Sequence, residues 1–560
     1  MPHELIISGG TVIDGTGTQG KQADVAVDNG RITRVGNLAG ETAGETIDAT
    51  GKLVTPGFVD LHTHLDAQIG WDPEMKPSSY HGVTTALIGN CGVTFAPVGE
   101  GKARYLAELM EAVEDIAADA IMDGLPWNWN SFGEYLDTVQ SLDPTLNVVG
   151  LAGHSAIRFE AMGDKACDKD VQADDKELAR IVELVKESVA EGAVGFSTSR
   201  FLGHKVPDGR LTPGTWADPR ETTAIQQAVV DAGGRGGLFQ VAPDMATRGK
   251  IEREMFERGA ELGCQVLFSE EVGNQEGLDS WTEYLQRNNE AGNCITSVCH
   301  TRPSGSFFGL AQQAYLATPA WREMMKLPTT ADRVAALRAD RNKLINEAKE
   351  AGGFGQVARI LHPLGTDAHP DFDLDRKRSL QQLADDSGKD PVEVYVDRLL
   401  ASEGLELWNL WTHGGNLEFQ WQYMQLPNVI PMLGDAGAHV GLFTDADSPT
   451  FLLGKLTRDR GIHTLEEAIH KITQQSADVI GIKERGSVKE GWHADLNVID
   501  YAELDSCHPE YVRDFPHNGG RFVVKSKGYD ATIVGGQIVI QNGIYTGNRP
   551  GQVIRDFIRA

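Results

Sequence analysis

The sequence lacks long apolar runs, and this absence excludes one broad class of protein. No stretch reaches the roughly 18 consecutive apolar residues that a membrane-spanning helix needs. The first residues also lack the basic flank and apolar stretch of a secretion signal. We therefore expect no membrane association and no secretion, and the predicted location is the cytoplasm.

Positive charge and cysteine are also scarce. Lysine and arginine number 51 against 80 aspartates and glutamates, which gives a formal net charge of −29. Nucleic-acid binding needs basic patches, so we exclude nucleic acid as a partner. The six cysteines contain no Cys-x-x-Cys pair, so we expect reduced and mostly buried thiols. They are Cys91, Cys167, Cys264, Cys294, Cys299 and Cys507.

The order of strand-like and helix-like segments predicts an α/β barrel with a smaller all-β domain. Both ends of the chain contain short β-prone runs separated by Asp-Gly and Asn-Gly turns, so residues 1–56 and 484–560 are expected to form one β-sandwich. Residues 57–483 alternate strand-like runs with helices, which is typical of parallel β/α units in a TIM (β/α)8 barrel. The eight candidate strands are Phe58–His62, Thr84–Gly89, Asn147–Ala152, Ala193–Ser197, Gly237–Val241, Gln265–Ser269, Cys294–Val298 and Val429–Gly434.

The segment between the seventh and eighth candidate strands, about 300–428, is far longer than an ordinary connection. It contains a strongly charged stretch, Ala331–Ala351, that is expected to form one helix. We therefore predict that this segment is an inserted helical cover over the site. Residues 100–145 form a second, smaller insertion. A capping-box pattern at Thr464–Glu467 predicts the start of a helix that runs to about Ile480.

His62-Thr63-His64 is the most informative motif, because it ends the first candidate strand. Side chains alternate along a strand, so residues two apart point the same way and both imidazoles can reach one metal ion. Parallel barrels keep their chemistry at this end of the strands. A chance occurrence among 16 histidines would have to coincide with the strand context, Pro56-Gly57 and Asp66. The motif therefore predicts a metal site.

Two further strand ends carry candidate ligands. Cys91 lies in Gly89-Asn-Cys-Gly92, where its thiolate is a sound zinc ligand beside two imidazoles, although most free cysteines are small buried hydrophobes. Both interpretations of Cys91 remain open. Asp435 ends the eighth candidate strand, where an unpaired carboxylate is costly. We expect Asp435 to bind the metal through one oxygen and to act as general base through the other; the alternative is a cap of the next helix.

Five more polar residues at or just beyond strand ends are candidate site residues. His154 can donate a hydrogen bond to a developing oxyanion, or it is a satisfied core histidine. Arg200 and Arg302 suit the capture of a substrate carboxylate, although either can instead be a structural ion-pair partner. His300 and His439 are expected to contact substrate, and His439 can alternatively orient Asp435.

Four other polar residues have weaker assignments. Asp66 and Gln68 continue from the histidine pair and are expected to line the pocket. His204 and His413 lie in loops, and we expect them to be ordinary polar residues.

Taken together, these residues resemble the amidohydrolase superfamily, and specifically its N-acyl-D-amino-acid deacylase branch. The resemblance implies a metal-bearing TIM barrel with a β-sandwich built from both termini. It also implies that His62, His64 and Asp435 bind one metal position, that Cys91 lies near the other, and that Asp435 is the catalytic base. The matching stretches are Pro56–Gln68, Gly82–Thr85, Gly89–Gly92, Gly192–Thr198, Gly434-Asp435, Gly491–Leu496, Gly535–Ile540 and Thr546–Gly551.

The chain departs from the pattern of better-known relatives on strands five and six, where each relative has a metal-binding histidine. Strand five offers only Gln240, or Asp244 just beyond it. Glu270 falls about where the strand-six histidine would be, and a carboxylate can bind zinc. Strand four has no lysine that could bridge two metals. The expected cofactor is zinc, as one ion or as two with substituted ligands, or another divalent metal.

The expected function is hydrolysis of the amide C–N bond of an N-acyl amino acid or a similar small molecule. Asp435 would take the proton of a metal-activated water and pass it to the leaving amine. The expected partners are a carboxylate-bearing small-molecule substrate and further copies of the chain in a homo-oligomer. Two alternatives remain open: a cyclic-amide or lactone hydrolase on the same barrel, and a metal-free scaffold that acts as a binding protein.

Overall fold

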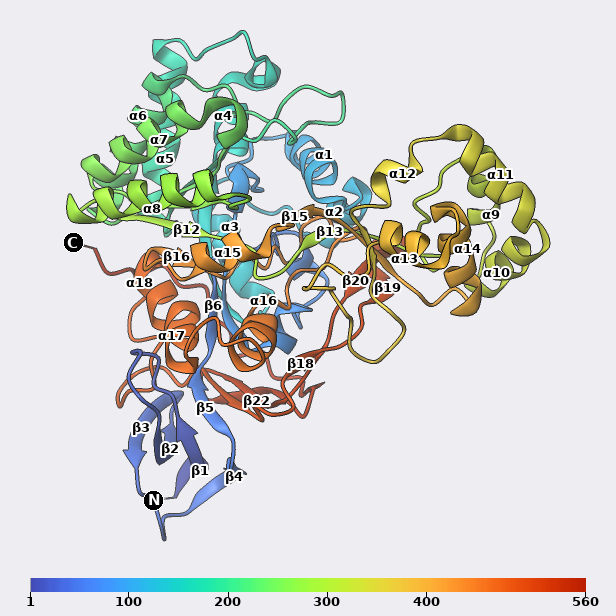
Figure 1. Ribbon diagram of the computed structural model, residues 1–560. Coiled ribbons are helices and arrows are strands. Elements are labelled where there is room, and N and C mark those ends of the chain that lie inside the picture. Colours follow the sequence, from blue (N-terminus) through green and yellow to red (C-terminus); the bar gives the residue numbers. More distant parts are fainter. Residues whose placement is uncertain (1, 560) are drawn as a thin grey trace.

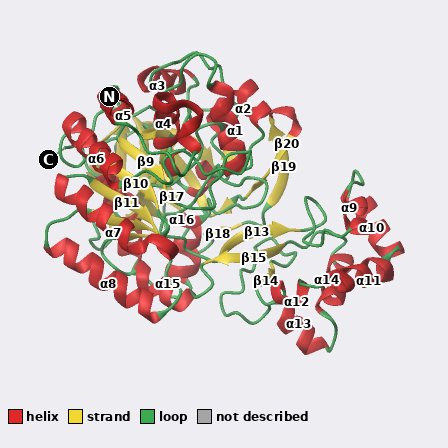
Figure 2. Ribbon diagram, turned by 90° about the horizontal axis from the view of Figure 1, so that it is seen from above, coloured by secondary structure: helices red, strands yellow, loops and turns green. Residues whose placement is uncertain are grey.

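An eight-stranded parallel sheet lies at the centre of the protein, in a computed structural model that describes residues 2–559 (Figures 1 and 2). Its strand order, β16-β12-β11-β10-β9-β8-β7-β6, follows the chain. Each of the eight predicted strands is confirmed, with no end more than four residues from its predicted position. The strands are β6 (Phe58–Asp60), β7 (Val83–Ile88), β8 (Asn147–Gly153), β9 (Gly195–Ser199), β10 (Leu238–Ala242), β11 (Gln265–Ser269), β12 (Ile295–Val298) and β16 (Val429–Ile430).

The first and last strands of this sheet are joined just beyond their carboxyl ends. The backbone N–H of Asp435 donates to the carbonyl of His62 at 3.1 Å, and the N–H of His64 donates to the carbonyl of Ala436 at 2.7 Å. A sheet whose two edges meet in this way fits a (β/α)8 barrel. The segments after β6 and β16 therefore lie side by side at one end of the sheet.

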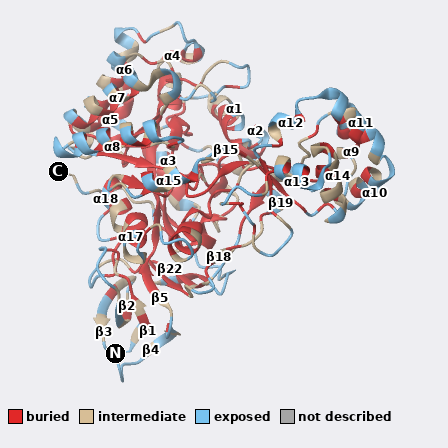
Figure 3. Ribbon diagram, in the orientation of Figure 1, coloured by how far each residue is buried: buried red, intermediate tan, exposed pale blue. Residues whose placement is uncertain are grey.

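Amphipathic helices cover the outside of the sheet. Figure 3 shows buried strands enclosed by helices whose outer faces are exposed. In residues 2–559, no helix is both long and apolar enough to cross a membrane. The helices that follow the strands are α4 (His154–Met162), α5 (Asp175–Ala190), α6 (Pro219–Gly233), α7 (Met245–Leu262), α8 (Gln275–Glu290), α16 (Ser448–Phe451), α17 (Leu465–His470) and α18 (Ser476–Ile480). The predicted capping box of α17 is present, with Thr464 accepting from the Glu467 N–H.

Both termini contribute to one separate nine-stranded sheet. Strand β5 (Leu53–Pro56) pairs with β1 (His3–Val12) on one side and with β17 (Leu496–Ile499) on the other. Only Gly57 separates β5 from β6, so this sheet holds the entry to the first barrel strand. The remaining strands are β2 (Lys21–Asp28), β3 (Arg31–Gly36), β4 (Ala43–Asp48), β22 (Tyr529–Val534), β23 (Gln537–Gln541) and β24 (Ile544–Tyr545).

The long insertion contains a helical lobe with a hydrophobic core of its own. Figures 1 and 2 show this lobe projecting to one side of the barrel. The expected single helix at Ala331–Ala351 is two helices, because the backbone leaves the helical conformation at Asp340. The lobe helices are α9 (Pro319–Met325), α10 (Thr330–Ala339), α11 (Arg341–Ala351), α12 (Phe354–Val357), α13 (Leu380–Ser387) and α14 (Pro391–Ala401).

A three-stranded sheet connects the lobe to the barrel. It consists of β13 (Ser304–Phe308), β15 (Trp408–His413) and β14 (Leu361–Pro363), in that order. The insertion ends with α15 (Leu417–Met424). The smaller insertion, between β7 and β8, forms α1 (Ala103–Glu114), α2 (Ala118–Gly124) and α3 (Phe132–Ser141).

Candidate metal centre and active site

A cavity of about 340 Å³ opens at the carboxyl ends of the barrel strands. Residues that follow seven of the eight strands line it, as the parallel arrangement predicts. None of its described lining residues belongs to α9–α14, so the expectation that the inserted helices cover the site is wrong. Of the described residues of the long insertion, His300 at its start and His413 at the end of β15 line the cavity.

Four of the predicted site residues converge in this cavity. One donor atom each from His62, His64 and Cys91 lies within 4.8 Å of the others. Cys91 Sγ is 3.3 Å from His62 Nε2. Asp435 Oδ1 lies 3.4 Å from His62 Nε2 and 3.3 Å from His64 Nε2. The predicted pairing of the two imidazoles on one face is therefore present, and the interpretation of Cys91 as an isolated buried hydrophobe does not fit.

The backbone is strained at the residues that bring these groups together. Cys91 (φ 55°) and Asp435 (φ 49°) both adopt the left-handed conformation, which costs energy for side chains other than glycine. Gly89 and Gly92 flank Cys91, and a side chain at Gly89 would lie 2.4 Å from the carbonyl oxygen of Leu151. The glycines are therefore required where the chain turns to place the sulfur.

Glu114 is a site residue that the sequence did not predict. It ends helix α1 in the smaller insertion, and its Oε1 lies 3.0 Å from Nδ1 of His64. A carboxylate behind a metal-binding imidazole fixes the orientation of the ring and the nitrogen that carries its proton. No strand end marks Glu114, so the pattern that identified the other residues could not find it.

Burial and neighbouring charges set the protonation states of His62, Asp435 and Cys91. Burial lowers the pKa of His62 to about 4, so this ring is neutral at neutral pH. Burial would raise the pKa of Asp435, but the neighbouring histidines, His64 foremost, hold it below its usual range. Burial raises the pKa of the Cys91 thiol. A thiolate at Cys91 therefore needs a cation beside it.

The donor set fits a divalent metal ion. Two imidazoles, a thiol and a carboxylate converge, and this combination of nitrogen, sulfur and oxygen ligands is the one that zinc prefers. Nδ1 of His62 is buried and has no hydrogen-bond partner within residues 2–559. Glu270 also lines the cavity but lies outside the three-residue donor group, and its role as a metal ligand stays a prediction.

Three residues predicted to act in catalysis or substrate binding do not line the cavity: His154, Arg200 and Arg302. Both ring nitrogens of His154 are occupied, Nδ1 at 2.8 Å from Thr198 Oγ1 and Nε2 at 2.8 Å from Glu221 Oε1. The expected donation from His154 to an oxyanion therefore does not fit, and His154 is the satisfied core histidine of the alternative interpretation.

The two arginines are likewise occupied by structural partners. Arg200 Nε donates to Glu252 Oε1 at 3.2 Å. Arg302 makes ion pairs with Asp445 and Asp447 at 2.8 and 2.7 Å. Both side chains are buried and neither lines the cavity, so capture of a substrate carboxylate by either one is not supported.

The histidines that line the cavity are more numerous than predicted. His300 and His439 lie there as expected. His204 and His413 lie there too, so the expectation that both are ordinary loop residues is wrong. His204 lies in the loop after β9, and His413 ends β15, a strand whose return to the barrel the sequence did not show. Glu271 Oε2 lies 3.6 Å from His413 Nδ1, and this nearby carboxylate raises the pKa of that imidazole.

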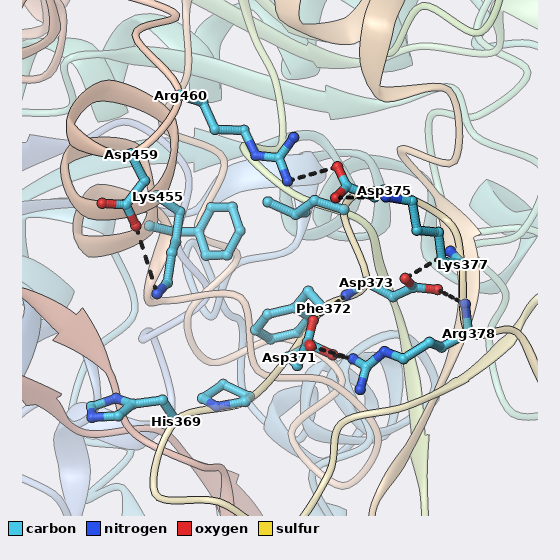
Figure 4. A pocket seen from close by; sticks show the side chains of 13 residues that line it. His369, Asp371, Phe372, Asp373, Asp375, Lys377, Arg378, Lys455, Asp459 and Arg460 are labelled. Atoms are coloured by element: carbon cyan, nitrogen blue, oxygen red, sulfur yellow. Dashed lines mark hydrogen bonds and ion pairs between the residues drawn. The ribbon is translucent and has the colours of Figure 1, made fainter.

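Asp66 and Gln68 do not line the cavity; both are buried beside it. A larger cavity of about 740 Å³ lies elsewhere, beside the loop before α13 (Figure 4). Its charged side chains pair with one another, for example Arg460 with Asp375 at 2.9 Å. The smaller cavity, with its convergent ligands, is therefore the candidate active site.

A parallel barrel with convergent metal ligands at its strand ends is the arrangement of a metal-dependent hydrolase. A sequence model of the amidohydrolase family matches residues 45–352 and 413–540. The chain therefore belongs to the amidohydrolase family, as its resemblance implied. The unmatched segment, residues 353–412, covers the later part of the lobe and most of β15.

Named relatives match almost the whole chain. D-aminoacylase from Alcaligenes xylosoxydans xylosoxydans is 27% identical, over 99% of this chain and 98% of the relative. N-acyl-D-aspartate deacylase from the same organism is 26% identical, over 98% and 95%. A solved structure of D-aminoacylase superposes with a TM-score of 0.67 at 24% identity, over 99% of this chain and 100% of that one.

A second solved structure has the same fold. It is N-acyl-D-glutamate deacylase from Bordetella bronchiseptica in complex with zinc and a phosphonate inhibitor. It superposes with a TM-score of 0.66 at 23% identity, over 99% of this chain and 100% of that one.

Proposed function

We propose that the chain is a metal-dependent hydrolase that cleaves the amide bond of N-acyl-D-amino acids. The observation that carries this proposal is the convergence of His62, His64, Cys91 and Asp435 at one cavity. These four residues would hold one zinc ion. A divalent cation bound there supplies Lewis acidity and lowers the pKa of a water molecule. Binding of a second ion, and of either ion by Glu270, stays a prediction.

Side chains of the protein provide proton transfer, orientation of a metal ligand and substrate binding. Asp435 Oδ1 faces the two histidines, which leaves Oδ2 to accept the proton of the attacking water and to return it to the leaving amine. Glu114 orients His64 through Nδ1. Because no arginine lines the cavity, we assign the substrate's α-carboxylate to His300 and His439, the substrate-binding residues proposed from the sequence.

The apolar part of the cavity suits the acyl group. Phe201 and Met245 line it, and 46% of the Phe201 surface is exposed although the ring is large and apolar. An acyl chain that covers Phe201 would remove this surface from water, which is favourable.

We also infer that residues 1–56 and 484–560 form a composite β-sandwich domain and that residues 57–483 form the barrel domain. The sheet that both termini share supports this division.

The test is a substrate panel with a protein sample whose metal content is known. We expect stoichiometric divalent metal and release of free amino acid from N-acetyl-D-amino acids. Turnover of hydantoins or lactones with no turnover of open-chain N-acyl amino acids would indicate a cyclic-amide or lactone hydrolase instead. A sample that contains no metal, binds none and hydrolyses nothing would indicate a scaffold. Neither alternative is favoured, because a D-aminoacylase and two N-acyl-D-amino-acid deacylases match almost the whole chain.

A further inference from the structure

The charges that line the active-site cavity are unbalanced. Five carboxylates line it, and none of its described lining residues is a lysine or an arginine. Relatives include deacylases named for N-acyl-D-aspartate and N-acyl-D-glutamate, whose substrates carry an extra negative charge. The cavity of this chain offers such a side chain no fixed positive charge. The five carboxylates are those of Glu114, Asp244, Glu270, Glu271 and Asp435.

Three of these five carboxylates already have partners. Glu114 contacts His64, and Asp435 contacts both histidines of the metal-binding motif. Asp244 caps helix α7, where its side chain accepts hydrogen bonds from Thr247. Glu270 and Glu271, which directly follow β11, are the two that remain.

These two neighbouring glutamates differ in how their charge is balanced. Glu271 Oε2 accepts a hydrogen bond from the Gly414 N–H at 3.0 Å and lies 3.6 Å from His413. Its Oε1 makes no hydrogen bond within residues 2–559 but lies 3.7 Å from the His300 imidazole. Glu270 uses one oxygen to accept the Glu271 N–H at 3.0 Å. The other oxygen, Oε2, is buried and has no hydrogen-bond partner among residues 2–559.

The surroundings of Glu270 do not supply the missing partner. Arg253 is the basic residue whose charge acts on Glu270, but its guanidinium stacks on Trp281 at 4.3 Å. It makes no hydrogen bond or ion pair to Glu270 in the described part of the chain. A buried carboxylate oxygen without a donor is costly, so a ligand that brings an N–H donor here gains binding energy.

We propose that Glu270, with Glu271 beside it, is a subsite for a cationic side chain on the amino-acid half of the substrate. This inference rests on the proposed function. A guanidinium or ammonium group would give Oε2 its missing donor through a charge-assisted hydrogen bond. A substrate carboxylate in the same place would meet the oxygens of two carboxyl groups and, among the described lining residues, no lysine or arginine. The enzyme therefore prefers N-acyl derivatives of basic amino acids to those of acidic ones.

The test compares kcat/KM for N-acetyl-D-arginine, N-acetyl-D-lysine, N-acetyl-D-glutamine and N-acetyl-D-glutamate at one ionic strength. We expect kcat/KM for the arginine and lysine derivatives to exceed kcat/KM for the glutamate derivative by about tenfold or more. A ratio of this size corresponds to at least one charge-assisted contact. The glutamine derivative, which matches glutamate in shape, should lie between them. Equal or faster turnover of the glutamate would overturn the proposal, whatever any variant does.

Glu270→Gln tests the residue itself, because it removes the charge and keeps the shape. The arginine-to-glutamate ratio should fall about fivefold or more while metal content stays unchanged. Glu283→Gln, on the exposed side of α8, is the matched control and should keep the ratio. An unchanged ratio in Glu270→Gln, or loss of its metal, would overturn the proposal.

Failure of the proposed function is a separate outcome. In that case no N-acyl amino acid of any side chain is hydrolysed. The subsite is then judged by calorimetric titration with D-arginine and D-glutamate. Tighter binding of D-arginine, lost in Glu270→Gln, supports it, and tighter binding of D-glutamate overturns it.

Discussion

Oε1 of Glu114 lies 3.0 Å from Nδ1 of His64, and both side chains are at most 2% exposed. The contact links a helix of an insertion to the first strand of the barrel. It holds the imidazole so that Nε2 faces Asp435 and the other ligands. A residue of the insertion thus positions a group at the centre of the site.

We predict that Glu114→Gln weakens metal binding about 10- to 100-fold, because the amide cannot stabilise the proton on Nδ1 as a carboxylate does. The measurement is metal occupancy at buffered free zinc concentrations. Glu111→Gln is the matched control, since Glu111 lies one turn earlier on the exposed face of α1. Equal affinities of Glu114→Gln and the native protein would contradict the positioning role.

We predict that Asp435→Asn lowers kcat by roughly 10²- to 10⁴-fold, because the amide cannot accept the proton of the attacking water. The assay is hydrolysis of an N-acetyl-D-amino acid by protein of known metal content. Asp143→Asn provides a control for the positive φ angle, because Asp143 (φ 48°) is exposed and has almost the same φ as Asp435 (φ 49°). Full activity in Asp435→Asn would refute Asp435 as the general base.

We predict that Arg200→Leu lowers the stability of the fold by about 3–5 kcal/mol and leaves KM nearly unchanged. The change removes the nearer cationic partner of the buried Glu252 carboxylate, at 3.2 Å, and leaves only Arg248 at 3.6 Å among the described residues; breaking one side of a buried ion pair costs about this much. Denaturant unfolding measures the first effect and steady-state kinetics the second. The double variant Arg200→Leu with Glu252→Gln should recover part of the loss. A large rise in KM without loss of stability would instead make Arg200 a substrate ligand.

We predict that buried His81 makes the fold less stable in mild acid. Burial lowers its pKa from 6.5 to about 4, so the unfolded chain takes up a proton that the folded chain excludes. This contribution is complete above pH 6.5 and falls as pH drops from 6.5 toward 4, by about 2 kcal/mol at pH 5. The stability difference between the native protein and His81→Gln should therefore shrink by that amount between pH 7.5 and 5.

The measurement for His81 is denaturant unfolding of both proteins at the two pH values. His517→Gln, at an exposed position, serves as the control and should track the native protein. A difference between the native protein and His81→Gln that does not change with pH would contradict the prediction.

The barrel could be predicted from the sequence because its strands are buried on both faces and are therefore short, apolar and distinct. Strand β11 was predicted with its observed bounds, Gln265–Ser269. The lobe was harder to predict. The break at Asp340 has no proline or glycine to mark it, and the direction in which the lobe projects depends on a sheet of strands from distant parts of the chain.

The site could be predicted only where chemistry coincides with a strand end. His62, Cys91 and Asp435 met that condition. The sequence could not show which polar residues have partners: Glu252 lies 52 residues from Arg200, and Asp447 lies 145 from Arg302. These partners turn two apparent substrate ligands into structural ion pairs.

The pairing of β5 with β17 also sets an order of assembly. Strand β5 leads into the strand that carries the histidine pair, yet its neighbour β17 lies near the other end of the chain. During synthesis, β5 therefore leaves the ribosome long before its partner exists. The histidine pair is anchored only after the last barrel strand and β17 have been made, so the metal centre is completed on a nearly full-length chain.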